Sequence, residues 1–577
     1  MTGWGCFREI WVLDFEFHAP PGEQPEPLCL VANEMRTGRR VDLWQDQLHQ
    51  GHPPFLIQPD VLFVAYFASA EIGCFLQLGW LVPSNVLDLY AEFRNRTNGQ
   101  ATPSGNGLLG ALDYFGLPGI AAAAKDEMRD LAIRGGPYPL NERRELLDYC
   151  AADVDATARL FERMRPGLDL GLALLRGQYT AAVASMERTG IPVDTGLLSE
   201  LLEHWPQIQA RLVEEVDQAF GVFDGLVFKQ GRFEAFLVAN GIPWPRLDSG
   251  ALALDDETFE AMELSYPIIK PLHELRSALA QMRRINLCVG SDHRARCLLS
   301  PFQSRTGRNQ PSNSRFLFGM SAWLRGLTRP EPGMGLAHID WSQQEFGIAA
   351  HLSGDTAMCH AYESGDPYLE FAKQAGAAPP NATKESHGPI RERFKACVLA
   401  VQYGMGEQGL ARRLGVTVVE ARDLLAHHRR TFSRFWRWSE GVVAYGQLGR
   451  KLWTTFGWEL NVEGAVNPRA LANFPMQANG AEMLRLACIY LARAGILVCA
   501  PVHDAVLIEA PLGELEATAE KAQALMAQAS SVVLGGPALR SDAELIRHPD
   551  RFSDKRGAGM WQLVNELLAS IVEWSDP

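Results

Sequence analysis

Residues 336–355 read LAHIDWSQQEFGIAAHLSGD, an apolar run followed by acidic and amide side chains. The apolar run predicts a short β-strand that presents Asp340 at its end. The apolar spacing that follows predicts a helix, which carries Glu345 near its start. Ser342 and Glu345 also have the spacing of a capping box, so a purely local role for these polar residues is the alternative.

A second candidate acid lies near the C-terminal end of the sequence. Residues 496–510 contain two apolar runs separated by His503 and Asp504, the pattern of a β-hairpin with an acid at its tip. Magnesium beside a phosphate usually has one or two protein carboxylates as ligands, so Asp340 and Asp504 are sufficient for such a site. Asp is also a common turn residue, and a turn-forming role for Asp504 is the alternative.

Between the two acids, residues 389–406 predict a helix that a proline opens and glycines close. Four residues recur at every fourth position and share one face of it: Arg391, Lys395, Leu399 and Tyr403. Cations at one end of this face and a ring at the other suit a nucleotide, with its triphosphate on the cations and its base against the ring. A solvated basic end on a core-packed helix is the alternative.

These segments resemble motifs A, B and C of the family A DNA polymerases, the family of bacterial DNA polymerase I. Motif A is DWSQQE from Asp340 to Glu345, motif B is Arg391-x3-Lys395-x7-Tyr403-Gly404, and motif C is Val502-His503-Asp504. Two further signatures of the family also match: Thr306-Gly307-Arg308 and Arg469-x3-Asn473-x3-Gln477.

The resemblance implies template-directed DNA synthesis, in which a primer 3′-hydroxyl attacks the α-phosphorus of an incoming dNTP. It implies that Asp340 and Asp504 hold two Mg²⁺, for which Mn²⁺ can substitute. Lys395 is expected to be catalytic. The expected dNTP-binding residues are Arg391, Lys395, Leu399, Tyr403, Glu345 and Gln344, and the expected primer-template contacts are Arg308, Arg469, Asn473, Gln477 and His503.

Three residues depart from the family pattern. Leu399 stands where an aromatic residue is common, Gly347 replaces a basic residue, and Ala505 follows Asp504 where Glu is usual. Pro475, which falls within the last signature, is able to interrupt its helix. None of these departures removes a predicted principal metal ligand, but they weaken any detailed transfer of nucleotide selectivity.

The N-terminal part of the sequence carries a second set of acids. A strand predicted over residues 9–17 places Asp14 and Glu16 on one side, where like charges repel each other unless a cation is present. A solvated strand edge is the alternative. Further candidates lie on predicted helices: Glu71, and the pair Tyr149 and Asp153, which are four residues apart.

These residues resemble the three motifs of the proofreading 3′ to 5′ exonuclease domain of the same polymerase family. The second motif departs from the pattern, because the family usually has Asp where this sequence has Glu71. The resemblance implies hydrolysis by two metal ions about 4 Å apart. The expected ligands are Asp14, Glu16 and Asp153, with Glu71 as a further catalytic acid and Tyr149 orienting the attacking water.

The predicted architecture has three parts. Residues 1–165 are expected to form an α/β exonuclease domain with a mixed, ribonuclease H-like sheet. Residues 166–300 are helix-rich and are expected to form a connector and thumb. Residues 301–577 are expected to form the palm and fingers of an α+β right-hand polymerase domain. No pattern of a 5′ nuclease domain accompanies them.

Composition limits the partners. The 577 residues are 47% hydrophobic and 21% charged, as in a globular protein, and carry a formal net charge of −14. DNA contacts must therefore come from local basic clusters. One candidate cluster is Arg283, Arg284, Arg294 and Arg296. The other spans residues 427–438, where a base-stacking platform and a packed helix with a solvated basic side both fit the pattern.

The ten cysteines include no C-x2-C pair, which argues against a zinc knuckle or a disulfide framework. No leader pattern is found, and Arg485 and Arg493 interrupt the longest apolar stretch. We therefore expect a reduced, soluble, cytoplasmic monomer without a membrane partner. A processivity factor is not indicated either way.

Three other functions fit parts of the pattern. A single-subunit RNA polymerase shares the palm and a similar motif B, but Glu345 favours a DNA enzyme, because the family's DNA polymerases use a bulky acid there to occlude the ribose 2′-hydroxyl. Asp340, Asp504 and Lys395 argue against a non-catalytic DNA-binding subunit, which gains nothing from clustered acids beside phosphates. A polymerase with an inactive exonuclease domain is the third alternative.

Overall fold

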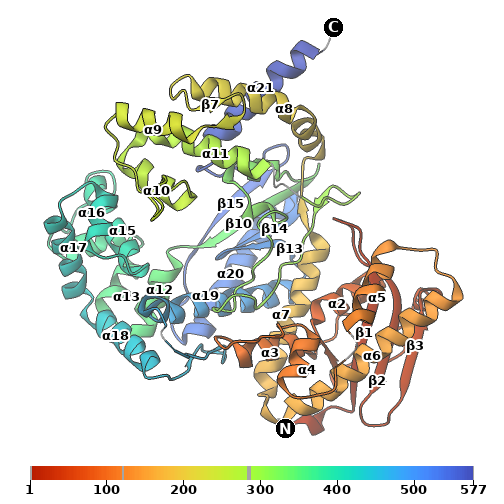
Figure 1. Ribbon diagram of the computed structural model, residues 1–577. Helices are drawn as coiled ribbons and strands as arrows, with labels where there is room; N and C mark the ends of the chain where they lie inside the picture. Colours follow the sequence, from red (N-terminus) through yellow and green to blue (C-terminus); the bar gives the residue numbers. More distant parts are fainter. Residues whose placement is uncertain (1–2, 120–121, 283–286, 465, 576–577) are drawn as a thin grey trace.

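The structure, a computed structural model, describes residues 3–119, 122–282, 287–464 and 466–575. Arg283 and Arg284 of the first basic cluster therefore lie outside the described residues. Figure 1 shows two β-sheets with helices packed against them and a group of helices that projects from one end. Within the described ranges, no helix is both long and apolar enough to cross a lipid bilayer.

The N-terminal region contains a mixed five-stranded sheet, as predicted. Its order is β3-β2-β1-β4-β5, with β1 antiparallel to β2 and parallel to β4. Alternate residues of the central strand enter two different apolar cores, one beneath α6 and the other beneath α2. The elements are β1 (Glu9–His18), β2 (Glu26–Glu34), β3 (Arg40–Trp44), β4 (Val61–Ala65), β5 (Val86–Asp88), α1 (Gln45–Leu48), α2 (Ala68–Gln77), α3 (Leu89–Thr97), α4 (Leu108–Tyr114), α5 (Ala122–Arg134) and α6 (Leu140–Met164).

Helix α7 (Leu170–Thr189) connects this sheet to the rest of the molecule, because it packs against α2 and β5 on one side and against the C-terminal sheet on the other. Its Gly177 approaches β5 so closely that a Cβ atom there would lie 1.8 Å from the carbonyl oxygen of Val86. A buried ion pair between Arg176 and Glu92 of α3 (Nε–Oε1 2.5 Å) ties α7 to the N-terminal region.

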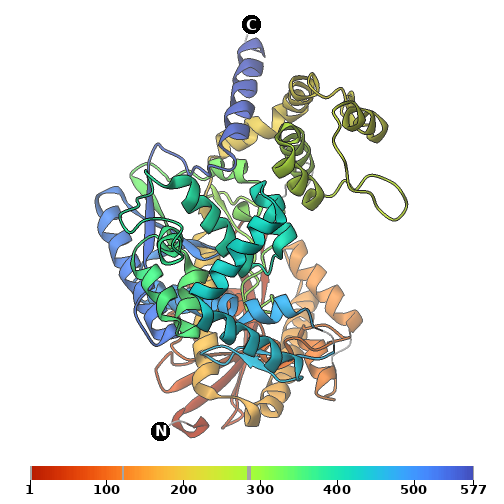
Figure 2. The same ribbon diagram turned by 90° about the vertical axis from the view of Figure 1, so that its left-hand side faces the viewer.

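The part of the predicted helix-rich segment that follows α7 forms a projecting group of helices (Figures 1 and 2). The C-terminal helix α21 returns to pack against α8, where Arg211 Nη1 donates to Ser570 Oγ at 2.5 Å. The predicted domain boundary at residue 300 falls after β9, and the division into three domains stays a prediction. The elements are α8 (Thr195–Asp217), α9 (Gln230–Ala239), α10 (Asp256–Ser265), α11 (Lys270–Met282) and α21 (Ala558–Ser575), with the short strand pairs β6 (Ile191–Pro192) with β9 (Arg294–Ala295) and β7 (Phe223–Asp224) with β8 (Val227–Phe228).

The second sheet is antiparallel, in the order β13-β14-β10-β15. The strand predicted to carry Asp340 is β10, and the predicted hairpin with Asp504 in its turn is β13–β14. Helices α19 and α20 pack against this sheet. The elements are β10 (Met334–Trp341), β13 (Leu497–Val502), β14 (Ala505–Pro511), β15 (Ser541–Arg547), α19 (Pro468–Arg493) and α20 (Leu515–Leu534).

The remaining helices form a layer beside this sheet (Figure 1). The helix predicted over residues 389–406 is α15, which begins with a proline in its first turn and is followed by Gly404 at φ +65°. The elements are α12 (Gln344–Ser353), α13 (Thr356–Glu363), α14 (Pro367–Gln374), α15 (Gly388–Gln402), α16 (Glu407–Leu414), α17 (Val418–Thr431), α18 (Ser433–Gln447) and the strand pair β11 (Leu452–Trp453) with β12 (Glu459–Leu460).

Two local expectations are wrong. Helix α19 runs unbroken through Pro475, because buried Leu471, Phe474 and Met476 hold it in the core on both sides of the proline. Ser342 does not cap α12: the chain turns sharply at Gln343 (φ +49°), and no side-chain cap forms.

The basic segment over residues 427–438 is a packed helix junction, and its aromatic residues do not form a stacking platform. Phe432 and Phe435 are buried, and the Arg429 guanidinium lies 4.9 Å from the ring centroid of Trp436. Trp436 Nε1 donates to Nδ1 of the buried His428 at 3.0 Å. The aromatic residues of this segment thus pack in or against the hydrophobic core.

This burial predicts a pH dependence of stability. Burial lowers the pKa of His428 to about 3, whereas an unfolded histidine has a pKa of about 6.5. Below about pH 6.5 the unfolded chain binds the extra proton, so the unfolding free energy falls by about 1.4 kcal/mol per pH unit for this residue. Between about pH 7 and about pH 5, the urea concentration at the midpoint of unfolding should fall less in His428→Phe than in the parent. The exposed-residue control His52→Phe should behave like the parent, and equal losses in all three proteins would contradict the prediction.

Candidate active site

Asp340 and Asp504 lie next to each other at the ends of neighbouring strands of the antiparallel sheet. The register pairs Asp340 with Ala505, which directly follows Asp504. Burial and the neighbouring charge of Asp504 raise the pKa of Asp340 to about 7, and burial raises the pKa of Asp504. Within the described part of the chain, Oδ1 of Asp340 is buried and has no hydrogen-bond partner. A buried carboxylate oxygen without a donor, beside a second acid, fits a divalent cation.

A third carboxylate lies beside this pair, and nothing in the local sequence indicates it. Strand β15 pairs with β10 on the side away from β14, and its register places Asp542 opposite Asp340. Ser342 Oγ donates a hydrogen bond to Asp542 Oδ2 at 2.5 Å. The serine expected to cap a helix thus contacts an acid 200 residues away in the chain.

Glu345 lies between the predicted DNA-contacting residues and the acids. Burial raises the pKa of Glu345, and a hydrogen bond from Gln477 together with the charge of Arg308 lowers it in part. The Arg308 Nη2 atom is 3.9 Å from Glu345 Oε1. Arg308 follows Gly307, whose carbonyl accepts from Nη1 of the buried Arg485 at 2.7 Å, so helix α19 fixes this turn.

The predicted nucleotide face of α15 is present, but its first cation is already paired. The Arg391 guanidinium donates to Asp366 and to Glu392 Oε1 (Nη1–Oε1 2.6 Å). The Lys395 Nζ atom is 3.9 Å from Glu392 Oε2 and remains partly exposed. Tyr403, at the C-terminal end of the helix, is 54% exposed. Lys395 is therefore the more accessible of the two cations.

The other predicted residues divide into accessible and buried positions. Gln344 is only 2% exposed and packs against Gly480 of α19, where a Cβ atom would lie 2.8 Å from its Oε1. Its contact with a nucleotide stays a prediction. Leu399 and Asn473 are half-buried, and His503 is exposed. Arg469 is exposed and, together with Tyr403, lines a cavity of about 910 Å³ between α10 and α16.

The N-terminal acids also converge. Oxygen atoms of Asp14 and Glu16 and the sulfur of Cys150 lie within 4.8 Å of one another. Glu71 Oε2 accepts from the backbone N–H of Phe15 at 2.8 Å, which places it between the two strand acids. Burial, followed by the charge of Asp14, raises the pKa of Glu71 well above its usual range. Mutual repulsion among these carboxylates fits a site for cations.

Helix α6 contributes the third exonuclease-like motif. Tyr149 Oη donates to Asp153 Oδ2 at 3.0 Å, so the predicted four-residue spacing brings these two side chains together. The thiol of Cys150, on the same helix, donates to the Asp14 carbonyl oxygen at 3.2 Å. Cys150 was not among the predicted site residues. The only signal for it in the sequence is its position next to Tyr149.

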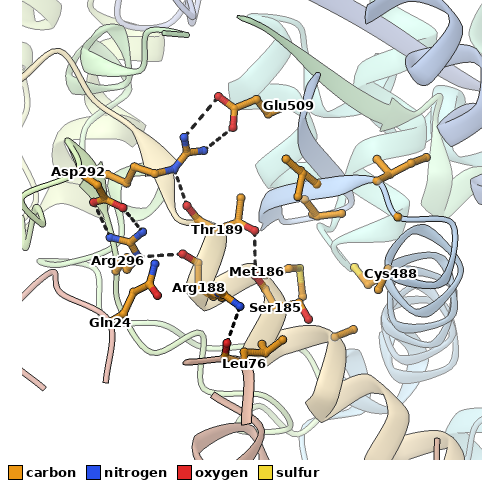
Figure 3. A pocket seen from close by; sticks show the side chains of 17 residues that line it. Gln24, Leu76, Ser185, Met186, Arg188, Thr189, Asp292, Arg296, Cys488 and Glu509 are labelled. Carbon is orange, nitrogen blue, oxygen red and sulfur yellow. Dashed lines mark hydrogen bonds and ion pairs between the residues drawn. The ribbon is translucent and has the colours of Figure 1, made fainter. Parts of the chain in front are cut away.

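A separate cavity of about 480 Å³ lies between the N-terminal region, α7 and the C-terminal sheet, and Arg294 and Arg296 of the first basic cluster line part of it (Figure 3). Arg294 is paired with Glu509 (Nη2–Oε2 2.5 Å), and Arg296 is paired with Asp292 (Nη2–Oδ2 2.5 Å). The expectation that these two arginines offer free charge to DNA is wrong, because acids from neighbouring segments neutralise them.

Comparison with known proteins identifies a match within the C-terminal half of the chain. The family model described as DNA polymerase family A matches residues 319–539, which include β10, α15 and the β13–β14 hairpin. Residues 319–539 belong to DNA polymerase family A. The family's match ends three residues before Asp542.

Two curated relatives are polymerases of bacterial origin. The chain is 29% identical over 409 residues to DNA polymerase I of Chloroflexus aurantiacus, covering 64% of this chain and 43% of that protein. It is 24% identical over 375 residues to the thermostable DNA polymerase I of Thermus aquaticus, covering 60% and 44%. The chain thus spans less than half the length of these relatives.

The fold is also that of a family A polymerase. A solved structure, the POL domain of Pol1 from M. smegmatis in complex with DNA primer-template and dNTP, superposes with a TM-score of 0.72 at 19% identity. The match covers 95% of this chain and 96% of that one. The predicted polymerase fold is therefore confirmed, whereas the roles of single residues are matters of proposal.

Proposed function

We propose that this chain is a DNA-directed DNA polymerase that extends a primer on a template by adding dNTPs. The observation that carries the proposal is the convergence of Asp340 and Asp504 at the ends of two neighbouring strands, with Glu345, Arg308 and Tyr403 around them. Family membership and the primer-template and dNTP named for the M. smegmatis structure support it.

In the proposed reaction, Asp340 and Asp504 would hold the divalent cations, Mg²⁺ or Mn²⁺. Cations bound there would lower the pKa of the primer hydroxyl and neutralise charge on the triphosphate. Lys395 binds the triphosphate near the N-terminal half of α15, where the helix dipole also favours an anion. Arg391 also binds the triphosphate: it releases its hydrogen bonds to Asp366 and Glu392 and donates to phosphate oxygens instead.

The surrounding residues position the substrates. Tyr403 and Leu399 pack beside the new base pair, and Glu345 occupies the space beside the sugar. The primer-template is contacted without reading its sequence by Arg308, Arg469, Asn473, Gln477 and His503. In this proposal the second sheet is the palm, the layer from α13 to α18 is the fingers, and the projecting helices are the thumb.

A primer-extension assay on a primed template tests this function. The parent protein should extend the primer with dNTPs in Mg²⁺, should extend poorly with rNTPs, and should stop when EDTA is added. Efficient extension with rNTPs would favour the RNA polymerase alternative. A folded protein that binds the primer-template without extending it would favour a non-catalytic DNA-binding subunit.

Glu345 provides a specific test of sugar selection. Shortening it in Glu345→Ala should raise incorporation of rNTPs relative to dNTPs by roughly 10- to 1000-fold, the scale on which a pocket discriminates by steric exclusion. Glu345→Gln keeps the size of the side chain and should keep most of the discrimination. The exposed-acid control Glu363→Ala should match the parent. An unchanged ratio in Glu345→Ala would assign the sugar gate to another residue.

We also propose a 3′ to 5′ exonuclease activity for the N-terminal region. Its support is the meeting of Asp14, Glu16 and Glu71 on and beside β1 with Tyr149 and Asp153 of α6. Asp14, Glu16 and Asp153 would hold the cations, and Tyr149 would orient the attacking water. Glu71 keeps the charge of the Asp usual in the family and adds one methylene group.

A further inference from the structure

The sheet places a carboxylate on each side of Asp340. Strand β10 lies between β14 and β15, so Asp340 faces Ala505, which follows Asp504, on one side and Asp542 on the other. Residues directly opposite in an antiparallel pair have their Cβ atoms about 4.5–5.5 Å apart and point to the same face. The side chain of Asp542 therefore shares its face of the sheet with that of Asp340.

Such an arrangement destabilises a sheet unless something positive compensates for it, because like charges directly opposite each other repel. In the part of the chain that the structure describes, no Lys or Arg forms an ion pair with Asp340 or with Asp542. The nearby Arg540 donates instead to Tyr362, Gly365 and Gln343.

The orientation of Asp542 is fixed by a neighbouring hydroxyl. Ser342 Oγ donates to Oδ2 at 2.5 Å, and this serine lies two residues after Asp340. A carboxylate oxygen accepts more than one hydrogen bond, so this contact leaves acceptor capacity at Asp542. Because Asp542 is exposed, a hydrated cation can reach it from solvent.

We propose that Asp542 is a third carboxylate of the polymerase metal centre, which strengthens cation binding at Asp340 and Asp504 from the side of β15. This inference rests on the proposed polymerase function. Asp542 acts as a positioning residue: it accepts hydrogen bonds from water around the cation and adds negative charge, while Asp340 and Asp504 supply the inner ligands. It lies outside the residues that the family model matches.

Binding of Mn²⁺ to the full chain, measured from the free ion by electron paramagnetic resonance, tests the inference. All variants carry Asp14→Ala and Glu16→Ala, which remove binding at the N-terminal acids. Asp542→Asn should weaken Mn²⁺ binding by roughly 10-fold or more, as loss of an outer partner of a metal site does. Asp542→Glu should restore much of it. The control Glu544→Gln removes one exposed charge two residues along the same strand and should have little effect.

A thermal melt supplies a second readout. Without metal, Asp542→Asn should melt at a higher temperature than its background protein, because the repulsion between two carboxylates is relieved. On addition of Mn²⁺, the melting temperature of Asp542→Asn should rise less than that of the background protein. Unchanged Mn²⁺ affinity in Asp542→Asn, or an equal loss in Glu544→Gln, overturns the inference.

Primer extension by the parent separates this inference from the proposed function. If the parent extends primers and Asp542→Asn keeps full Mn²⁺ affinity, only the inference fails. If Mn²⁺ binding depends on Asp542 but the parent does not extend primers, only the proposed function fails.

Discussion

Asp340→Ala and Asp504→Ala are each expected to abolish primer extension while leaving degradation of single-stranded DNA intact. The reason is that the two sets of acids lie on separate sheets, Asp340 on β10 and Asp14 on β1. Loss of a metal ligand removes several kcal/mol of transition-state stabilisation, which corresponds to a drop in rate of about 10³-fold or more. Both activities should be measured on both variants.

The comparison needs variants that keep the fold. Asp340→Asn preserves the shape of the side chain and should be as inactive in extension as Asp340→Ala, because an amide is a poor replacement for an anionic ligand. Asp550→Ala removes an exposed acid that lies after β15 and should extend normally. Parallel loss of extension and degradation in a variant that melts like the parent would contradict the existence of two separate sites.

The double variant Asp14→Ala/Glu16→Ala is expected to release no mononucleotides from a mismatched 3′ end, while it extends a matched primer as the parent does. These two acids form the β1 side of the proposed exonuclease site, and their removal takes away two of its ligands. Release should be measured with Mg²⁺ and with Mn²⁺. If the parent releases no more than the double variant, the N-terminal region is inactive and serves packing alone.

Glu71 determines whether the second exonuclease motif is correctly assigned. Glu71→Gln can still accept the hydrogen bond from the Phe15 backbone and keeps the packing of α2, but it lacks the charge. Release should fall sharply in Glu71→Gln and in Glu71→Ala. If Glu71→Ala releases mononucleotides as fast as the parent, Glu71 is a structural residue of the sheet and the motif lies elsewhere.

Local patterns in the sequence were sufficient to predict several parts of the candidate sites. A proline and two glycines delimit α15, and the spacing of four residues correctly placed Tyr149 beside Asp153. The period of two along β1 placed Asp14 and Glu16 on one side. Each of these inferences depends on residues within one element, where backbone geometry alone relates the side chains.

Other parts depend on contacts between distant segments. The register that brings Asp542 opposite Asp340 and the hydrogen bond from Ser342 join residues about 200 positions apart, and no periodicity encodes them. The same holds for the charges, because Arg391 and Arg294 look available for anions in the sequence but are neutralised by Asp366 and Glu509.

The sequence by itself thus determined the order of the motifs, the elements that carry them and the family. Only the tertiary structure decided which cations remain available, that α19 runs through Pro475, and which third acid lies beside the predicted pair. The physical reason is that helix and strand periodicity is a property of near neighbours, whereas ion pairing and strand register follow from packing of the whole chain.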